Sequence, residues 1–170
     1  MERIAELIEY LEEAMETAAQ EWIEQLKKVD TTSIKKILQE VGENAHPDSH
    51  VVITYLRSSV ITDSHQFRLA VYQGEPFVEV PIYHTLLDMK PLYQEVLNDV
   101  QVLIKKLSPP YFQILSSEKE EIRRSFTVKL YQQSYHFFER VLEEMSADHQ
   151  QIIIYFGEEM SELMMIGAEE

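Results

Sequence analysis

The chain has 170 residues, a formal net charge of −15 and no cysteine. Without thiols it can form no disulfide, cysteine-ligated zinc finger, iron–sulfur cluster or thiolate nucleophile. Its four glycines are spaced by ten residues or more. Phosphate-binding loops of the Walker and dinucleotide types need two or three glycines within about eight residues, so both are excluded.

Negative charge is concentrated at the two ends of the chain. Residues 1–30 carry nine acidic and three basic residues, and residues 137–170 carry nine acidic residues and one basic residue. The intervening segment holds twelve acids and eleven bases and is nearly neutral. Such a field repels nucleic acid and anionic lipid and attracts basic groups. We therefore expect a partner protein with a basic surface or segment, and neither nucleic acid nor membrane as a partner.

The N-terminal segment does not resemble a targeting sequence. Glu2, Glu6 and Glu9 stand where a signal peptide carries bases, and the longest apolar stretch, Ile152–Phe156, is far shorter than the ~20 residues of a membrane span. The chain length suits one hydrophobic core. These features predict a cytoplasmic protein with a single domain over residues 1–170 and a mobile acidic tail at 167–170.

Residues 3–29 show the clearest helical periodicity. Apolar residues recur every three or four positions, as on one face of a helix and close to a heptad seam. Two interpretations remain open for this segment: a core helix lying across a sheet, or, over residues 1–29, a dimerisation helix that pairs with its copy. The stripe consists of Ile4, Ile8, Leu11, Met15, Ala18, Trp22, Leu26 and Val29.

A second helix and a group of strands are predicted next. Asp30, Thr31 and Thr32 supply capping side chains for a helix that ends near Gly42. Residues 51–61, 66–73 and 77–82 are rich in β-branched and aromatic residues and are separated by turn sequences. They predict a three-stranded antiparallel meander over about residues 51–82.

Two interpretations are open for residues 111–131, which follow a third helix that opens at Pro91. A capping box of Ser117 and Glu120 favours a long helix. Alternatively, Tyr111–Leu115 and Phe126–Tyr131 alternate like strands. With those strands, the element order of residues 31–146 resembles that of type III secretion chaperones, and this resemblance implies a chaperone-like α+β fold.

The C-terminal segment is equally ambiguous. Gln151–Phe156 suits a buried strand or the start of a helix. Met160, Met164 and Met165 either fill gaps in the core or adapt to a partner, as flexible methionine side chains can. Trp22, Met160 and Met164 are the candidate partner-binding residues.

One segment offers side chains of the types that bind metal. Glu43, His46, Asp48 and His50 lie within eight residues, although Pro47 prevents a helical arrangement and the composition also suits an ordinary loop. Two further histidines are spaced for pairing with a carboxylate on a helical turn, namely His84 with Asp88 and His136 with Glu139.

Together these patterns predict an α+β fold with a long N-terminal helix, a second helix, the meander, and helices packed on one face of the sheet. The leading hypothesis is a non-enzymatic, homodimeric adaptor or chaperone-like binder that needs no cofactor. One alternative is a small metal-dependent enzyme with ligands in the Glu43–His50 loop. The other is an acidic inhibitor that mimics nucleic acid.

Overall fold

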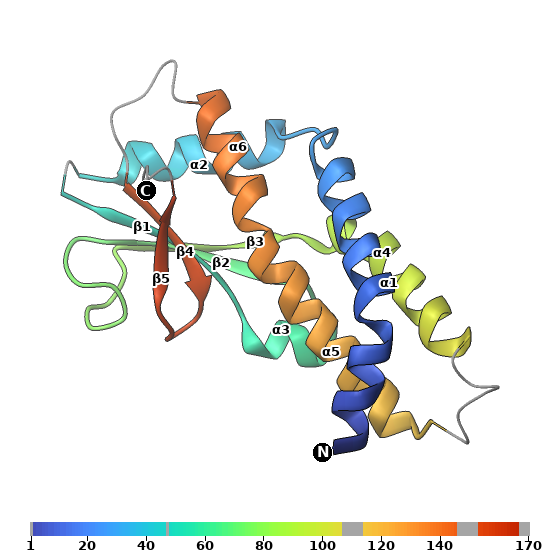
Figure 1. Ribbon diagram of the computed structural model, residues 1–170. Helices are drawn as coiled ribbons and strands as arrows, with labels where there is room; N and C mark the ends of the chain where they lie inside the picture. Colours follow the sequence, from blue (N-terminus) through green and yellow to red (C-terminus); the bar gives the residue numbers. More distant parts are fainter. Residues whose placement is uncertain (1, 47, 107–113, 146–152, 167–170) are drawn as a thin grey trace.

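The computed structural model describes residues 2–46, 48–106, 114–145 and 153–166, and it confirms the α+β class (Figure 1). A long N-terminal helix is followed by alternating helices and strands, and the C-terminal part forms a hairpin. The elements in chain order are α1 (Glu2–Leu26), α2 (Thr32–Asn44), β1 (His50–Tyr55), α3 (Arg57–Thr62), β2 (Gln66–Tyr72), β3 (Tyr83–Asp88), α4 (Lys90–Lys106), α5 (Ser116–Gln133), α6 (Tyr135–Met145), β4 (Ile153–Glu158) and β5 (Leu163–Ile166).

The strands form one mixed sheet in the order β3-β2-β1-β4-β5. β1, β2 and β3 pair antiparallel in succession, which confirms the predicted meander. β4 pairs parallel to β1 in the centre of the sheet, with His50 opposite Ile153, and β5 pairs antiparallel to β4. The C-terminal segment is therefore a strand hairpin, as one of its two interpretations expected.

The bounds of two predicted strands need correction. The first was expected to reach Ile61, but it ends at Tyr55 and α3 follows, closed by Asp63 in the left-handed region with φ 54°. The third was expected at residues 77–82, but β3 occupies residues 83–88. Pro81 has no N–H to donate to a ladder, and regular pairing starts just beyond it, with Tyr83 opposite Val71.

The segment that begins near residue 114 is helical, so the strand alternative for Phe126–Tyr131 is wrong, and with it the element order that resembled the chaperones. Tyr111–Leu115 lies mostly outside the described residues. The capping pair is also displaced: the Leu115 N–H donates to Glu118 Oε2 at 2.8 Å, whereas Glu120 binds Arg123. The Glu118 side chain thus caps the N-terminus of α5, which begins at Ser116.

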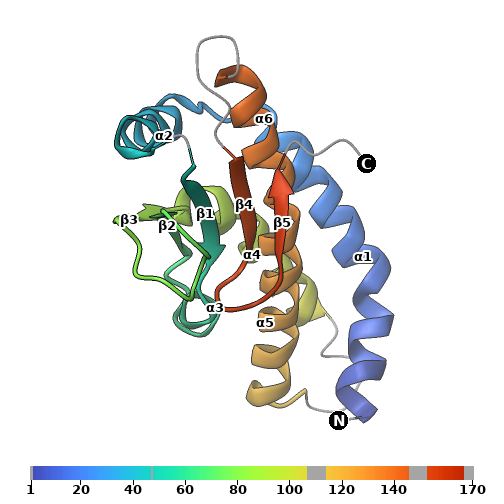
Figure 2. The same cartoon turned by 90° about the vertical axis from the view of Figure 1, so that its left-hand side faces the viewer.

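Helices α1, α4, α5 and α6 lie on one side of the sheet, as predicted, and the view in Figure 2 shows the other side without a helix in front of it. Phe67 of β2 is fully buried at the centre of this interface, with ring centroids 5.0 Å from Tyr131 and 6.0 Å from Tyr93. The opposite face holds a much smaller cluster around Val52, Ala70 and Tyr72. The sheet thus has one thickly covered face and one thinly covered face.

The apolar stripe of α1 packs into the chain's own core, as the first of its two interpretations expected. The residues that are no more than 5% exposed are Leu7, Leu11, Met15, Ala19, Trp22 and Leu26. The predicted members Ile8 and Ala18 are half-buried at its margins. Because this stripe packs within one chain, a second α1 would have to contact another face of the helix, and pairing between copies stays a prediction. No helix in the described ranges is both long and apolar enough to span a bilayer.

Candidate functional site: the groove between α1 and α4

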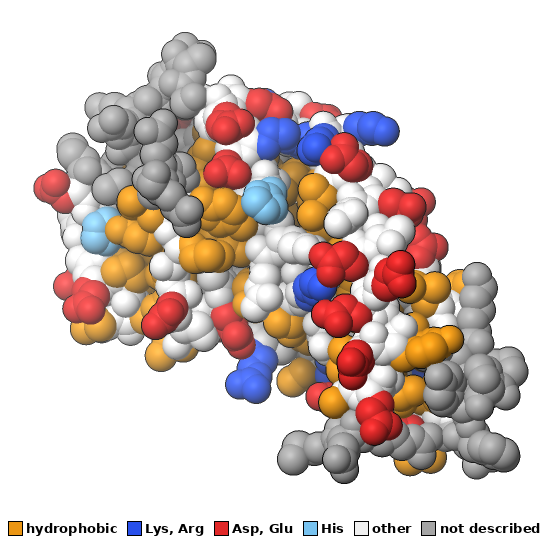
Figure 3. All heavy atoms as spheres, in the orientation of Figure 1, with side chains coloured by type: hydrophobic (Ala, Val, Ile, Leu, Met, Phe, Trp, Pro, Cys, Tyr) orange, Lys and Arg blue, Asp and Glu red, His pale blue; other side chains and the backbone are white. Residues whose placement is uncertain are grey.

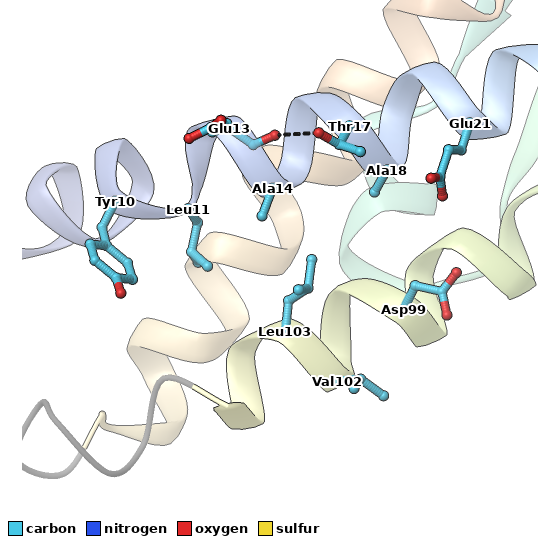
Figure 4. Close-up of a pocket in the computed structure, with 10 residues that line it drawn as sticks. All are labelled: Tyr10, Leu11, Glu13, Ala14, Thr17, Ala18, Glu21, Asp99, Val102 and Leu103. Atoms are coloured by element: carbon cyan, nitrogen blue, oxygen red, sulfur yellow. Dashed lines mark hydrogen bonds between the residues drawn. The ribbon is translucent and has the colours of Figure 1, made fainter.

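A groove with a volume of about 840 Å³ runs between α1 and α4 (Figure 4). We call it the α1–α4 groove. α1 supplies one wall over three helical turns, and the C-terminal half of α4 supplies the other. Its lining residues are Tyr10, Leu11, Glu13, Ala14, Thr17, Ala18, Glu21, Asp99, Val102 and Leu103.

Short side chains keep the groove open. Ala14 and Ala18 point from α1 toward α4, and Leu103 points back into the gap between the helices (Figure 4). Thr17 donates its hydroxyl to the Glu13 carbonyl oxygen at 2.9 Å, so this polar group is already satisfied within α1. Ala14 and Ala18, one helical turn apart on this side of α1, therefore leave space that larger side chains would fill.

At the other end of the helix pair, α1 and α4 are held close together. Trp22 donates its indole N–H to the carbonyl oxygen of Leu92 at 2.6 Å, and its ring lies 5.3 Å from that of Tyr93. Both α1 and α4 also contact α5, which passes behind the groove. The groove is thus a gap between helices whose positions are fixed elsewhere in the fold.

The rim of the groove is acidic, and its lining combines polar and apolar surface in nearly equal parts. Glu13, Glu21 and Asp99 are exposed, and among the described residues none of these three side chains has a cationic partner. Two large apolar side chains also remain open to solvent, Tyr10 at 59% and Val102 at 47%. Figure 3 shows acidic side chains spread along α1 with apolar ones beside them toward α4. Such a surface suits an occupant that is apolar on one side and cationic on the other.

A second hollow, of about 180 Å³, lies where the α3–β2 turn meets α4 and α5. Arg123 lines it, but its guanidinium is already engaged with Asp63, with Glu120 at 2.6 Å and with the Val60 carbonyl at 3.3 Å. The hydrogen bond from Arg123 lowers the pKa of the Glu120 carboxyl. The charges of this hollow compensate one another, which is typical of a structural ion-pair network.

Comparison of the chain with protein families, curated proteins and solved structures found no match. The candidate site therefore stands on its geometry.

The loop considered for metal binding does not gather its side chains. Glu43, His46 and Asp48 are exposed, and the His46 N–H donates to the Ser49 hydroxyl within a turn at 2.9 Å. His50 starts β1, and its ring lies edge-on to Tyr155 at 5.6 Å. In the part of the chain that the structure describes, no three His, Asp or Glu side chains are grouped to hold a metal ion.

The two histidine–carboxylate pairs have different outcomes. His136 and Glu139 lie one turn apart on α6, with 3.5 Å between Nδ1 and Oε2, as their spacing predicted. His84 and Asp88 lie on strand β3 instead of a helical turn, so the predicted pairing within the chain is wrong. Residues four apart on a strand are separated by about 13 Å.

The candidate partner-binding residues are placed apart from one another. Trp22 is 2% exposed and belongs to the core, whereas Met160 and Met164 are 76% and 50% exposed on the β4–β5 hairpin. The groove itself was not anticipated from the sequence. The available signal was a group of small residues at the margin of the predicted stripe of α1, namely Ala14, Thr17 and Ala18, the last of which was assigned to the stripe itself.

Proposed function

We propose that the chain is a non-enzymatic, cytoplasmic binding module that holds a basic amphipathic segment of a partner protein in the α1–α4 groove. The observation that carries this proposal is an open gap lined by Leu11, Ala14, Ala18 and Leu103, with three carboxylates at its rim that have no cationic partner among the described residues: Glu13, Glu21 and Asp99. Cationic side chains of the partner would meet these carboxylates while its apolar side chains entered the gap.

The dimensions of the groove fit a short helix. From Tyr10 to Glu21 the α1 wall is about 17 Å long at 1.5 Å per residue, which corresponds to three turns of a bound helix. Helix-in-groove recognition places anchors at positions i, i+3 or i+4, and i+7. We expect two or three apolar anchors between Tyr10 and Val102, and lysine or arginine on the flanks.

The apolar anchors would supply most of the affinity. Burying one leucine-sized side chain stabilises a complex by about 1.5–3 kcal/mol before the cost of ordering the segment, whereas an exposed ion pair adds about 0.2–1 kcal/mol. The rim charges would instead select the sign of the partner and raise the association rate. Binding should therefore weaken with salt but persist, unlike that of a nucleic-acid mimic, which depends on charge throughout.

A pair of designed peptides tests this proposal. The first is an 18-residue amphipathic helix of leucine and lysine, and the second replaces every lysine by glutamate. With isotope-labelled full-length protein, we expect amide shifts at residues 10–21 and 99–103 on adding the leucine–lysine peptide, and none with the leucine–glutamate peptide. Equal responses to both peptides, or shifts confined to other elements, would overturn the proposal.

Substitutions in α1 distinguish binding in the groove from attraction to the net negative charge of the chain. Ala18→Trp fills the gap and should abolish the response, and Glu21→Lys should weaken binding several-fold. Glu12→Lys makes the same charge change on the opposite side of α1, outside the groove, and should leave affinity nearly unchanged. If Glu12→Lys and Glu21→Lys weaken binding equally, net charge rather than the groove recognises the peptide.

A further inference from the structure

The outer edge of β3 combines an open backbone with exposed apolar side chains. β3 is the last strand of the sheet that the described residues form, so its outward N–H and C=O groups face no described strand, and α2 is a helix that contacts it. In the stretch that leads into and through it, the exposed large apolar residues are Val78 at 73%, Val80 at 86%, Ile82 at 48% and Leu86 at 50%. An open strand edge with exposed apolar side chains in it and in the loop before it is a candidate interaction site.

The charge distribution identifies which edge of the sheet a second copy could approach. At the opposite edge, the β4–β5 hairpin carries Glu158, Glu159 and Glu162, of which Glu159 is paired with Arg68 at 2.8 Å. Two copies meeting there would bring together six carboxylates and two arginines. The β3 edge belongs to the nearly neutral middle of the chain. Its nearest acid in the preceding loop, Glu79, turns back so that its carboxylate packs against Gly74. Of the two sheet edges, the β3 edge therefore presents less electrostatic repulsion to a second copy of this acidic chain.

The hydrogen-bond phase of the β2–β3 ladder shows which groups face outward. The Met89 N–H donates to the His65 carbonyl at 3.0 Å, which makes these two a hydrogen-bonded pair. Alternation along an antiparallel ladder then directs the backbone of residues 83, 85 and 87 toward β2. It directs the backbone of His84, Leu86 and Asp88 outward, where another strand could pair with it.

We infer that two copies of this chain pair through their β3 strands, antiparallel and related by a twofold axis at Leu86. In this register Leu86 lies opposite Leu86 of the second copy, and each His84 lies opposite Asp88 of the other. Directly opposed side chains on one face approach within about 5 Å, so the apolar centre is flanked by two histidine–carboxylate contacts. Pro81 lacks an N–H and limits regular pairing to the six residues of β3.

This interface is self-complementary, as a twofold contact must be, and it joins two five-stranded sheets into one of ten strands. It does not rest on the proposed function, because the α1–α4 groove involves other elements. It also gives a role to His84 and Asp88, which are too far apart along β3 to pair within one chain.

Sedimentation of the full-length protein is the first test. At 100 µM and pH 7 we expect a species of twice the 20.0 kDa chain mass. A monomer under these conditions would overturn the inference.

The absence of native cysteine allows a direct positional test. Leu86→Cys places one thiol per chain at the twofold axis, and mild oxidation should give a covalent dimer on a non-reducing gel. Met165→Cys is the matched control, since Met165 is 43% exposed on the same face of the sheet at the other edge. Equal cross-linking of the two variants, or preferential cross-linking of Met165→Cys, would contradict the β3 interface.

A charge exchange tests the register. His84→Asp puts a carboxylate opposite Asp88 of the second copy and should weaken dimerisation at least tenfold. The double variant His84→Asp/Asp88→His restores opposite partners and should recover most of the loss. Circular dichroism of each variant checks folding, because Asp88 Oδ1 also accepts a hydrogen bond from the Lys90 N–H at the start of α4. A folded double variant that stays as monomeric as His84→Asp would exclude this register.

Discussion

His65 Nδ1 and the Tyr131 hydroxyl form a 2.7 Å hydrogen bond between residues 66 positions apart in the chain. The bond joins the turn before β2 to the last turn of α5. The His65 ring is 4% exposed and stacks on Tyr93 at 5.4 Å, so it is enclosed by two tyrosines of the core. Burial lowers the pKa of His65; the charges of Arg123 and Lys90 act in the same direction, while Asp63 and Asp88 oppose them.

This burial predicts a stability that decreases in mild acid. Below about pH 6.5 an unfolded histidine binds a proton, whereas folded His65 stays neutral until a lower pH, so protons favour the unfolded chain in that window. The unfolding free energy from urea titrations should fall between pH 7.5 and 5.5, by up to about 1.4 kcal/mol per pH unit from one such group. His65→Gln should flatten this slope. A His65→Gln variant with the same slope as the unmodified chain would contradict the assignment.

Removing residues 1–29 should unfold the chain. The truncation exposes the core against which Leu11, Met15 and Trp22 pack, and each buried side chain of this size stabilises the fold by about 1.5–3 kcal/mol. The combined loss is comparable with the whole stability of a typical domain, about 5–15 kcal/mol. Thermal unfolding followed by circular dichroism should show no cooperative transition. A truncated protein that melts cooperatively would mean that α1 is an appendage.

Met160→Gly should stabilise the chain. Met160 lies in the β4–β5 turn with φ 65°, in the left-handed region, and its side chain is 76% exposed. Glycine relieves about 1–2 kcal/mol of strain in the left-handed conformation. It also makes the unfolded chain more flexible, which costs about 0.5–1 kcal/mol of folding free energy, and little packing is lost, so the net effect is stabilising. The melting temperature should rise by about 1–4 °C. A lower melting temperature would show that the methionine side chain stabilises the turn.

Gly157→Ala should have the opposite effect on the same hairpin. A Cβ at Gly157 would lie 2.7 Å from the Glu162 carbonyl oxygen and 3.1 Å from Leu163 Cδ2, so β4 and β5 would have to separate. Overpacking of this kind costs about 1–3 kcal/mol. Gly42→Ala is the control, because Gly42 lies within α2, where alanine is favoured over glycine. Chemical denaturation should give opposite signs for the two variants.

The sequence predicted those elements whose local pattern and tertiary environment agree. The stripe of α1 and the run Phe67–Val71 each have one dominant periodicity, and both form the predicted element. The first strand was extended too far because Val60 and Ile61 have strand-like side chains, whereas Ser59 ends up buried, where its hydroxyl donates to the Gln66 carbonyl and favours a short helix.

The candidate site was harder to predict for a physical reason. A groove is set by how two helices pack, and sequence periodicity identifies the buried face of each helix without fixing the distance between them. Acidity at the N-terminus was visible from the sequence and predicted a basic partner. The position of Asp99 beside Glu21 depends on the pairing of α1 with α4, residues almost eighty positions apart, and no local pattern contains that information.

The parallel pairing of β1 with β4 has a consequence for how this chain is made. β1 is the central strand, yet one of its two neighbours arrives about a hundred residues later, so half of its backbone has no partner until β4 has been synthesised. Such long-range pairing slows folding and leaves strand edges exposed meanwhile. In a nascent chain that ends at α6, β1 would be an open edge strand, although it is the central strand of the completed sheet. Nascent chains halted before β4 should therefore be held by chaperones, and release of the last strand should complete the fold.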